Sequence, residues 1–394
     1  MRNNLFVILI LLISVSTSCV AQNDEKVIPA AERDHLYLPM LQNKSVGLVG
    51  NQSSLVGDQH LVDFLLSKNI RIKRIFSPEH GFRGTADAGE KIKNSKDVKT
   101  GISIVSLYGK HFKPGIEEVQ DLDIMIFDIQ DVGVRFYTYI STLHYVMEIC
   151  AEQNIPLIVL DRPNPNAHYI DGPVLEKKYS SFVGMHPVPV VYGLSIGEYA
   201  KMINGESWLK GKVKCDLKVI PCKNWTRNQV YDLPVKPSPN LPNALSVALY
   251  PSLCFFEGTP VSAGRGTDQP FQCFGHPKMN QGDFSFTPRS IPGASKYPKF
   301  EGEKCFGKDL SKFDLMDFRK RKNLDLSFLL LAHQQLHSNT KFFNAFFKNL
   351  AGTDTLRKQI EKGMSEEEIR ATWQKDLESY KEIRKKYLIY SDWK

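Results

Sequence analysis

The sequence predicts an α/β protein with a mainly parallel sheet, followed by a second, smaller α+β domain. From about residue 36 to 200, short apolar runs alternate with helical stretches, which is typical of βαβ units. Residues 232–300 instead contain many prolines, glycines and aromatics and show little periodicity. Polar clusters also follow the apolar runs directly, where open α/β sheets bind ligands. We therefore expect an enzyme with domains at 36–200 and 201–394.

The first domain is expected to contain strands joined by right-handed crossovers, with helices covering the sheet. Apolar residues at alternate positions, or in short runs, predict strands at Ser45–Val49, Ile70–Phe76, Ile102–Ser106, Ile124–Ile129 and Pro156–Leu160. Helical spacing predicts helices at Gln59–Ser67 and Tyr139–Gln153.

The second domain is expected to contain long ordered loops and short strands, because Leu245–Phe256 is too apolar to stay solvated. Helices return at Leu324–Leu336 and near the end of the chain. Ser365 and Glu368 form a capping-box pattern ahead of a charged stretch that reaches about Tyr387.

Residues 1–21 have the pattern of a secretory signal. Arg2 precedes the apolar run Leu5–Val15, which is too short to span a bilayer, and small polar residues follow. Lipoprotein processing would make Cys19 the lipidated first residue, whereas ordinary cleavage would fall after Ala21. Both alternatives predict an exported protein, either periplasmic or anchored to the membrane as a lipoprotein.

Composition excludes several classes of protein. The chain has 51 Lys and Arg against 43 Asp and Glu, and no basic stripe interleaved with aromatics indicates nucleic acid. No GxGxxG motif supports a dinucleotide, and no metal-ligand spacing recurs, so we expect neither a cofactor nor a metal. The seven cysteines lack a CxxC pair, which predicts buried thiols or an occasional disulfide.

The richest polar cluster is Ser77–Gly84, directly after a predicted strand. It carries Glu79, His80 and Arg83, and the glycine-punctuated loop behind it adds Glu90. Two carboxyl groups at a fixed separation are what most glycosidases use. The alternative is that Glu79 only caps or ion-pairs within its own loop.

Another polar cluster lies at the end of the predicted strand Ile124–Ile129 and beyond it, and contains Asp128, Asp131, Arg135 and Tyr137. A carboxylate at the end of a buried strand is costly to desolvate, so we expect these aspartates to meet a cation or a donor, with Arg135 as the obvious partner. A divalent metal held with His80 is the alternative.

The remaining candidates are substrate-binding residues. Asn51 follows the first strand, where its amide could bind a sugar or simply complete a turn. Arg162 follows Leu160, and Glu257, Arg265 and Asp268 lie in the second half. Aromatics beside carboxylates, and an arginine flanked by glycines, suit a sugar pocket.

Five motifs in this order resemble the bacterial exo-β-N-acetylmuramidase family from about residue 36 to the C-terminus. They are Phe76–Gly84, Asp128–Tyr139, Leu160–Pro165, Asp171–Pro173 and Phe256–Thr259 with Arg265–Thr267. The resemblance implies a Rossmann-like domain and a smaller domain with the cleft between them. It also implies removal of terminal N-acetylmuramic acid from the non-reducing ends of peptidoglycan fragments, with Glu79 as a catalytic residue.

We interpret Glu79 as the general acid, positioned by His80, with Asp131 or Glu90 as the second group, or with catalysis assisted by the substrate's acetamido group. Arg135, Arg162 and Arg265 are candidates for the lactyl carboxylate of muramic acid. A metal-dependent hydrolase and a non-catalytic glycan-binding lipoprotein remain as alternatives.

Overall fold

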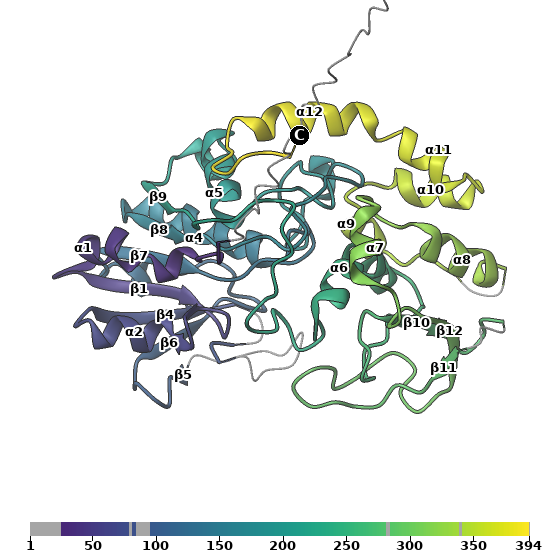
Figure 1. Cartoon of the computed structure of the whole chain (residues 1–394), viewed down its shortest axis with the longest axis horizontal. Coiled ribbons are helices and arrows are strands. Elements are labelled where there is room, and N and C mark those ends of the chain that lie inside the picture. Colours follow the sequence, from purple (N-terminus) through teal and green to yellow (C-terminus); the bar gives the residue numbers. More distant parts are fainter. Residues whose placement is uncertain (1–24, 79–80, 84–94, 281–283, 339–340, 394) are drawn as a thin grey trace, which may run out of the picture.

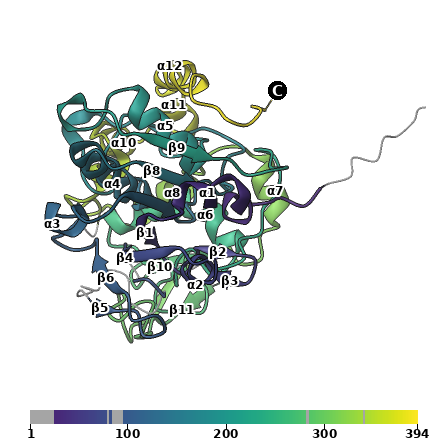
Figure 2. The ribbon, with the colours of Figure 1, turned by 90° about the vertical axis from the view of Figure 1, so that its left-hand side faces the viewer.

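A seven-stranded sheet and a smaller unit lie side by side in the computed structural model (Figure 1), which describes residues 25–78, 81–83, 95–280, 284–338 and 341–393. The order of the sheet is β5-β6-β4-β1-β7-β8-β9, and every pairing is parallel except β5 with β6. Figure 2 shows β9 at one end of the stack and β5 at the other. Its strands are β1 Ser45–Gly50, β4 Arg71–Ser77, β5 Ser95–Lys96, β6 Ser103–Ser106, β7 Ile124–Asp128, β8 Leu157–Leu160 and β9 Leu217–Ile220.

All five predicted strands are therefore confirmed, as is the α/β class. The central strands are buried along almost their whole length, and β7 has no exposed residue, because helices cover both faces of the sheet. The helices are α1 Leu38–Leu41, α2 Leu61–Ser67, α3 Ile116–Val119, α4 Tyr139–Gln153, α5 Ile196–Gly205, α6 Ala244–Leu253, α7 Leu315–Lys320, α8 Ser327–Leu336, α9 Phe347–Ala351, α10 Thr355–Glu361, α11 Glu366–Ala371 and α12 Gln374–Lys385.

Helix boundaries differ from the predictions in places. The bounds of α4 match, but Gln59–His60 form strand β3, which pairs with β2, Leu55–Val56. The predicted capping box of Ser365 and Glu368 is confirmed at α11. This helix ends at Ala371, and a separate helix, α12, begins at Gln374.

The second unit contains the helices α6 to α9 and a three-stranded antiparallel sheet (Figure 1), and α6 contacts α7 and α8. Its strands are β10 Cys273–His276, β11 Phe284–Phe286 and β12 Cys305–Asp309. The expectation of loops and short strands over 232–300 is wrong at α6. That helix is apolar on all sides and buried, so it lacks the periodicity by which an amphipathic helix is recognised.

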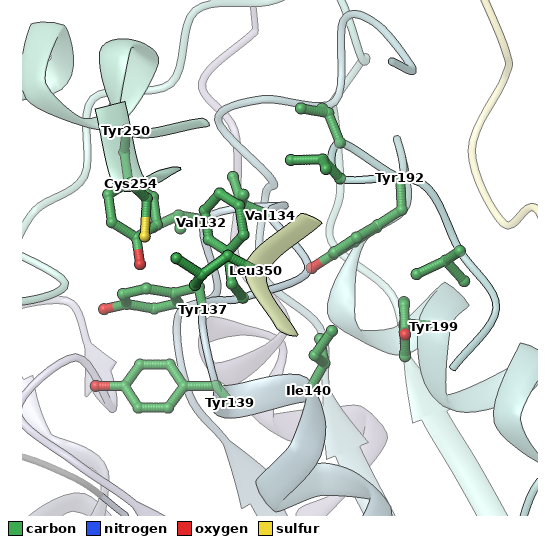
Figure 3. Packing of buried hydrophobic residues seen from close by; sticks show 14 of the residues in the cluster. Val132, Val134, Tyr137, Tyr139, Ile140, Tyr192, Tyr199, Tyr250, Cys254 and Leu350 are labelled. Atoms are coloured by element: carbon green, nitrogen blue, oxygen red, sulfur yellow. The ribbon is translucent and has the colours of Figure 1, made fainter. Parts of the chain in front are cut away.

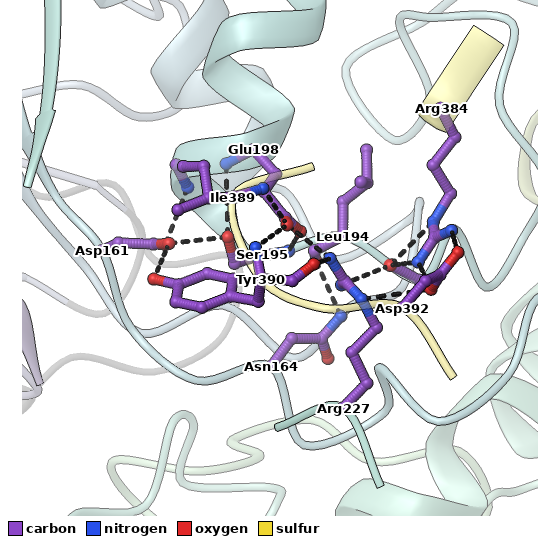
Figure 4. A network of polar contacts seen from close by, with 12 residues as sticks. Asp161, Asn164, Leu194, Ser195, Glu198, Arg227, Arg384, Ile389, Tyr390 and Asp392 are labelled. Carbon is purple, nitrogen blue, oxygen red and sulfur yellow. Dashed lines mark hydrogen bonds and ion pairs between the residues drawn. The ribbon is translucent and has the colours of Figure 1, made fainter. Parts of the chain in front are cut away.

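The boundary expected at residue 200 is wrong, because β9 pairs with β8 and belongs to the large sheet. The C-terminal segment also returns to this sheet (Figure 4). Tyr390 donates its hydroxyl to Asp161, at the carboxyl end of β8, over 2.6 Å. The guanidinium of Arg384 pairs with Asp392 at 2.7 Å and donates to the carbonyl of Gly193.

Six cysteines of the described chain are buried free thiols: Cys150, Cys215, Cys222, Cys254, Cys273 and Cys305. Cys19 and Ala21 lie outside the described residues. Among the described helices, none combines the length and the apolarity needed to cross a bilayer.

Candidate active site

A cavity of about 510 Å³ lies between the large sheet and the second unit. A smaller cavity of about 70 Å³ shares Phe136, Thr138, Tyr250 and Arg265 with it. The large cavity is lined by Tyr108, Phe136, Thr138, Phe182, Val183, Tyr250, Cys254, Glu257, Arg265, Ala294, Ser295, Lys296, Tyr297, Phe346 and Leu350. The two cavities therefore form one cleft whose walls come from both units.

The loop after β7 provides the sheet side of this cleft. It turns at Gly133, which has a φ of 76°, and a Cβ there would lie 2.1 Å from Oδ1 of Asn164. Only glycine fits that turn, because the left-handed backbone and the close approach of Asn164 both exclude a side chain. The backbone N–H of Arg135 then donates to the carbonyl of Val190 at 2.8 Å, and Phe136 to Thr138 lead along the cleft into α4.

Tyrosine side chains form the wall of the smaller cavity. The hydroxyl groups of Tyr137, Tyr139 and Tyr250 point to the same side of the buried cluster (Figure 3). Tyr137 donates to the carbonyl of Pro237 at 2.7 Å, which fixes its ring. Burial raises the pKa of Tyr137 well above its ordinary value, so the phenol stays protonated and can donate.

Asn51 holds this wall in place from behind. Its Nδ2 donates to the hydroxyl of Tyr139 at 2.9 Å, while its Oδ1 accepts from the backbone and hydroxyl of Ser53. The side chain is fully buried and lines neither cavity. Asn51 therefore completes a turn and positions Tyr139, and the prediction that it contacts substrate is not supported.

An ion pair of Arg265 and Glu257 lies in the cleft. Nε of Arg265 is 2.8 Å from Oε1 of Glu257, both side chains are half-buried, and the guanidinium lies over the ring of Phe271 at 5.0 Å. Burial alone would raise the pKa of Glu257, but Arg265 and Lys299 together lower it, so this carboxylate is ionised at neutral pH. Within the described chain the Nη atoms of Arg265 make no hydrogen bond, and they remain available to a ligand.

Arg162 and Asp128 form a buried bidentate pair, with Nε 2.6 Å from Oδ1 and Nη2 2.8 Å from Oδ2. Nη2 of Arg162 also donates to the carbonyl of Leu55. The expectation that Asp128 meets a cation is confirmed, but the partner is Arg162 and not Arg135. The pair uses both side chains, so the prediction of substrate contact by these residues is not supported.

Arg135 is a structural residue, which corrects its assignment to the lactyl carboxylate. Its guanidinium is fully buried, and its Nη atoms donate to the carbonyls of Pro173, Val188 and Leu350 at 2.7 to 2.8 Å. Burial lowers its pKa to about 9. The guanidinium has no exposed surface and lines neither cavity, so a substrate in the cleft cannot reach it.

Asp131 is also turned into the protein. Its carboxylate is 3% exposed and accepts from the hydroxyl of Tyr192 and from the backbone N–H of Gly133. Burial raises its pKa to about 6, although these donors oppose the shift. It lines neither cavity, so a direct catalytic role for Asp131 gains no support.

Two further predicted ligands lie elsewhere. Asp268 is 81% exposed and pairs with Arg289 at the surface, away from both cavities. Arg83 makes a bidentate pair with Asp97, at 2.9 and 2.8 Å, and lies beside the ring of Phe82. Neither contact places these side chains in the cleft.

Glu79, His80 and Glu90 lie outside the described residues. The chain on either side of the first two is described: Ser77 ends β4, between β1 and β6, and the N–H of Gly81 donates to the carbonyl of Pro78. In the described chain, no group of three or more His, Cys, Asp or Glu side chains is arranged to hold a metal ion.

Sequence reasoning missed several residues of the cleft, and also Lys299, which supports the cleft without lining either cavity. Lys299 donates through Nζ to the carbonyls of Phe256, Thr259 and Val261 and thereby anchors the segment that carries Glu257. Tyr250 lies inside the apolar run of α6, where the sequence pattern does not distinguish a residue that lines the cleft from a residue of the core. Tyr297 and Phe346 lie in stretches without a motif, so no signal in the chain could have identified them.

Comparisons with known proteins agree with this architecture. The family models described as exo-beta-N-acetylmuramidase NamZ, N-terminal and C-terminal, match residues 46–245 and 248–390. The peptidoglycan beta-N-acetylmuramidase NamZ of Bacillus subtilis (strain 168) is 39% identical over an alignment of 372 residues, which covers 90% of this chain and 89% of that protein. Two crystal structures of DUF1343 family proteins from Bacteroides fragilis are also similar. One has a TM-score of 0.87 and 48% identity, covering 93% of this chain and 100% of that one. The other has a TM-score of 0.76 and 27% identity, covering 93% and 99%.

Proposed function

Since the chain belongs to the exo-β-N-acetylmuramidase family, as its motifs predicted, we propose that it removes terminal N-acetylmuramic acid from the non-reducing ends of peptidoglycan fragments. The chain is a glycoside hydrolase. The observation that carries the proposal for this chain is the half-buried pair of Arg265 and Glu257 in the cleft.

Arg265 is proposed to bind the lactyl carboxylate, the group that distinguishes muramic acid from glucosamine. Of the three predicted arginines, it is the one that lines the cavity. Nε of Arg265 donates to Glu257, so the two Nη groups of Arg265 can donate to the carboxylate of a ligand. With Lys299 nearby, the three side chains carry a net positive charge, which favours an anionic ligand.

Glu79 is proposed as the general acid, with His80 positioning it. The burial of Asp131 favours Glu90 for the second role, either as a base or nucleophile or, in catalysis assisted by the substrate, as the group that orients the acetamido group. Support for Glu79 comes from the chain around it, because Ser77 ends at the carboxyl edge of the sheet, where ligands of such sheets bind. Export through residues 1–21, and lipidation of Cys19 in place of cleavage after Ala21, are proposed from the sequence alone.

The test compares Glu79→Gln with wild type on a chromogenic β-N-acetylmuramide. The amide cannot protonate the leaving oxygen, so kcat is expected to fall by about 10² to 10⁴-fold in a protein that still folds. Glu301→Gln, an exposed glutamate, is the control and keeps wild-type turnover. Turnover like wild type in folded Glu79→Gln removes Glu79 from the mechanism.

The same assay separates the alternative functions. A chelator leaves a glycosidase active but inactivates a metal-dependent hydrolase that uses His80, Asp128 and Asp131. A glycan-binding lipoprotein binds the muramide without releasing the chromophore. Inactivation by a chelator, or binding of the muramide without release of the chromophore, contradicts the proposed function.

A further inference from the structure

We propose that Tyr297 and Phe346 form a binding site for the sugar on the leaving-group side of the scissile bond. This assignment rests on the proposed function and specifies how the aglycone is held in the same cleft.

Exposure sets these two side chains apart from the other phenylalanine, tyrosine and tryptophan residues that the structure describes. Tyr297 is 82% exposed and Phe346 is 39% exposed, and they are the only exposed large aromatics among the residues that the structure describes. Both line the cavity of about 510 Å³. Single exposed apolar residues are ordinary on a protein surface, but two large rings at one cavity form a patch that indicates a ligand.

The large-sheet unit also contributes aromatic side chains to the lining of the cavity. Phe182 stacks on Phe112 with ring centroids 4.0 Å apart, and Tyr145 continues the stack behind them. Phe182 and Tyr108 line the cavity from the large-sheet unit, whereas Tyr297 and Phe346 line it from the second unit. A ligand in this cavity therefore meets aromatic rings from both units.

The segment that carries Tyr297 is held on both sides. Before it, Nδ2 of Asn240 donates to the carbonyl of Ala294 at 2.7 Å, and the N–H of Ser295 bonds to the carbonyl of Ile291. After it, Lys299 is fixed by its contacts to three carbonyls. The exposed ring therefore stands on an ordered support, which lowers the entropy lost when a ligand covers it.

The chemistry of a pyranoside fits the exposed edge of the cavity at Tyr297 and Phe346, which we call the rim. Its axial C–H groups make an apolar face that an aromatic ring covers, while its hydroxyl groups stay in water or meet polar groups at the edge. Lys296, with Nζ 5.6 Å from the ring centroid of Tyr297, is such a group. Arg265 borders both cavities, so the anionic terminal sugar is recognised there and the rim remains for the next sugar.

The test uses two substrates that differ only in the leaving group: a β-N-acetylmuramyl disaccharide and β-N-acetylmuramyl fluoride, which has no leaving-group ring. Tyr297→Ala is expected to lower kcat/KM for the disaccharide about tenfold, equivalent to about 1.4 kcal/mol, and to leave the fluoride within about twofold. Tyr297→Phe keeps the ring and is expected to retain wild-type kcat/KM on both.

Tyr179→Ala is the matched control. Tyr179 also follows a lysine whose Nζ lies over its ring, at 5.1 Å, but it does not line the cleft. An unchanged disaccharide rate in Tyr297→Ala overturns the assignment. Equal losses on both substrates also overturn it, because the ring would then lie under the terminal sugar. If wild type cleaves neither substrate, the proposed function itself fails.

Discussion

Replacement of Arg265 tests how the cleft recognises muramic acid. In Arg265→Met the side chain keeps its length and loses the guanidinium, so the lactyl carboxylate has no charged donor. A hydrogen bond to a charged group contributes about 1.5 to 3 kcal/mol, which is a factor of roughly 10 to 150 in kcat/KM. Because the side chain is 27% exposed, the lower half of this range is expected.

The assay measures kcat/KM on the chromogenic β-N-acetylmuramide and on the matching glucosaminide. Arg265→Met is expected to lose activity on the muramide and little on the glucosaminide, so the ratio of the two falls. Arg289→Met is the control, since Arg289 pairs with an aspartate at the surface and lines neither cavity. A wild-type ratio in folded Arg265→Met refutes carboxylate recognition by this residue.

Three further outcomes are expected. The pKa of Asp131 is raised to about 6 in the folded state, above an unfolded value of about 3.9. The protonated carboxyl group therefore adds about 3 kcal/mol to the free energy of unfolding below pH 4, and this contribution is lost as the pH rises through 6. Urea unfolding from pH 4 to 8 should therefore show a shallower decline for Asp131→Asn than for wild type. Asp128→Ala leaves Arg162 buried without its carboxylate partner and is expected to lower the free energy of unfolding by about 3 to 5 kcal/mol. The double variant Asp128→Ala, Arg162→Met is expected to regain part of this loss. A loss under about 1 kcal/mol in Asp128→Ala contradicts the buried pair. Cys19→Ser should move the protein from the membrane fraction to the soluble one, and an unchanged distribution favours cleavage after Ala21.

The large sheet could be predicted from the sequence because its signals are local. Apolar runs such as Ile124–Ile129 and the helical spacing of Tyr139–Gln153 report burial within one element. The buried helix α6 and strand β9 were harder, since α6 has no polar face and β9 is a short strand with an exposed residue. Sequence pattern gave no means of placing β9 in the first unit.

The candidate site was predictable in its location more than in its contacts. Polar residues after strands identified the carboxyl edge of the sheet, and Arg265 lies in the cleft. Pairing depends on tertiary structure, however: Asp128 meets Arg162, 34 residues away, and not Arg135. Arg135 donates hydrogen bonds to carbonyls from three distant segments, and the sequence near Arg135 contains no pattern that predicts such partners.

The most direct test of the central claim uses two disaccharides of N-acetylmuramic acid and N-acetylglucosamine in opposite order. The purified protein is incubated with each, and free N-acetylmuramic acid is measured by mass spectrometry. We predict release from the disaccharide with muramic acid at its non-reducing end and none from the reversed one. Equal cleavage of both, or cleavage of the reversed one alone, contradicts an exo-acting muramidase.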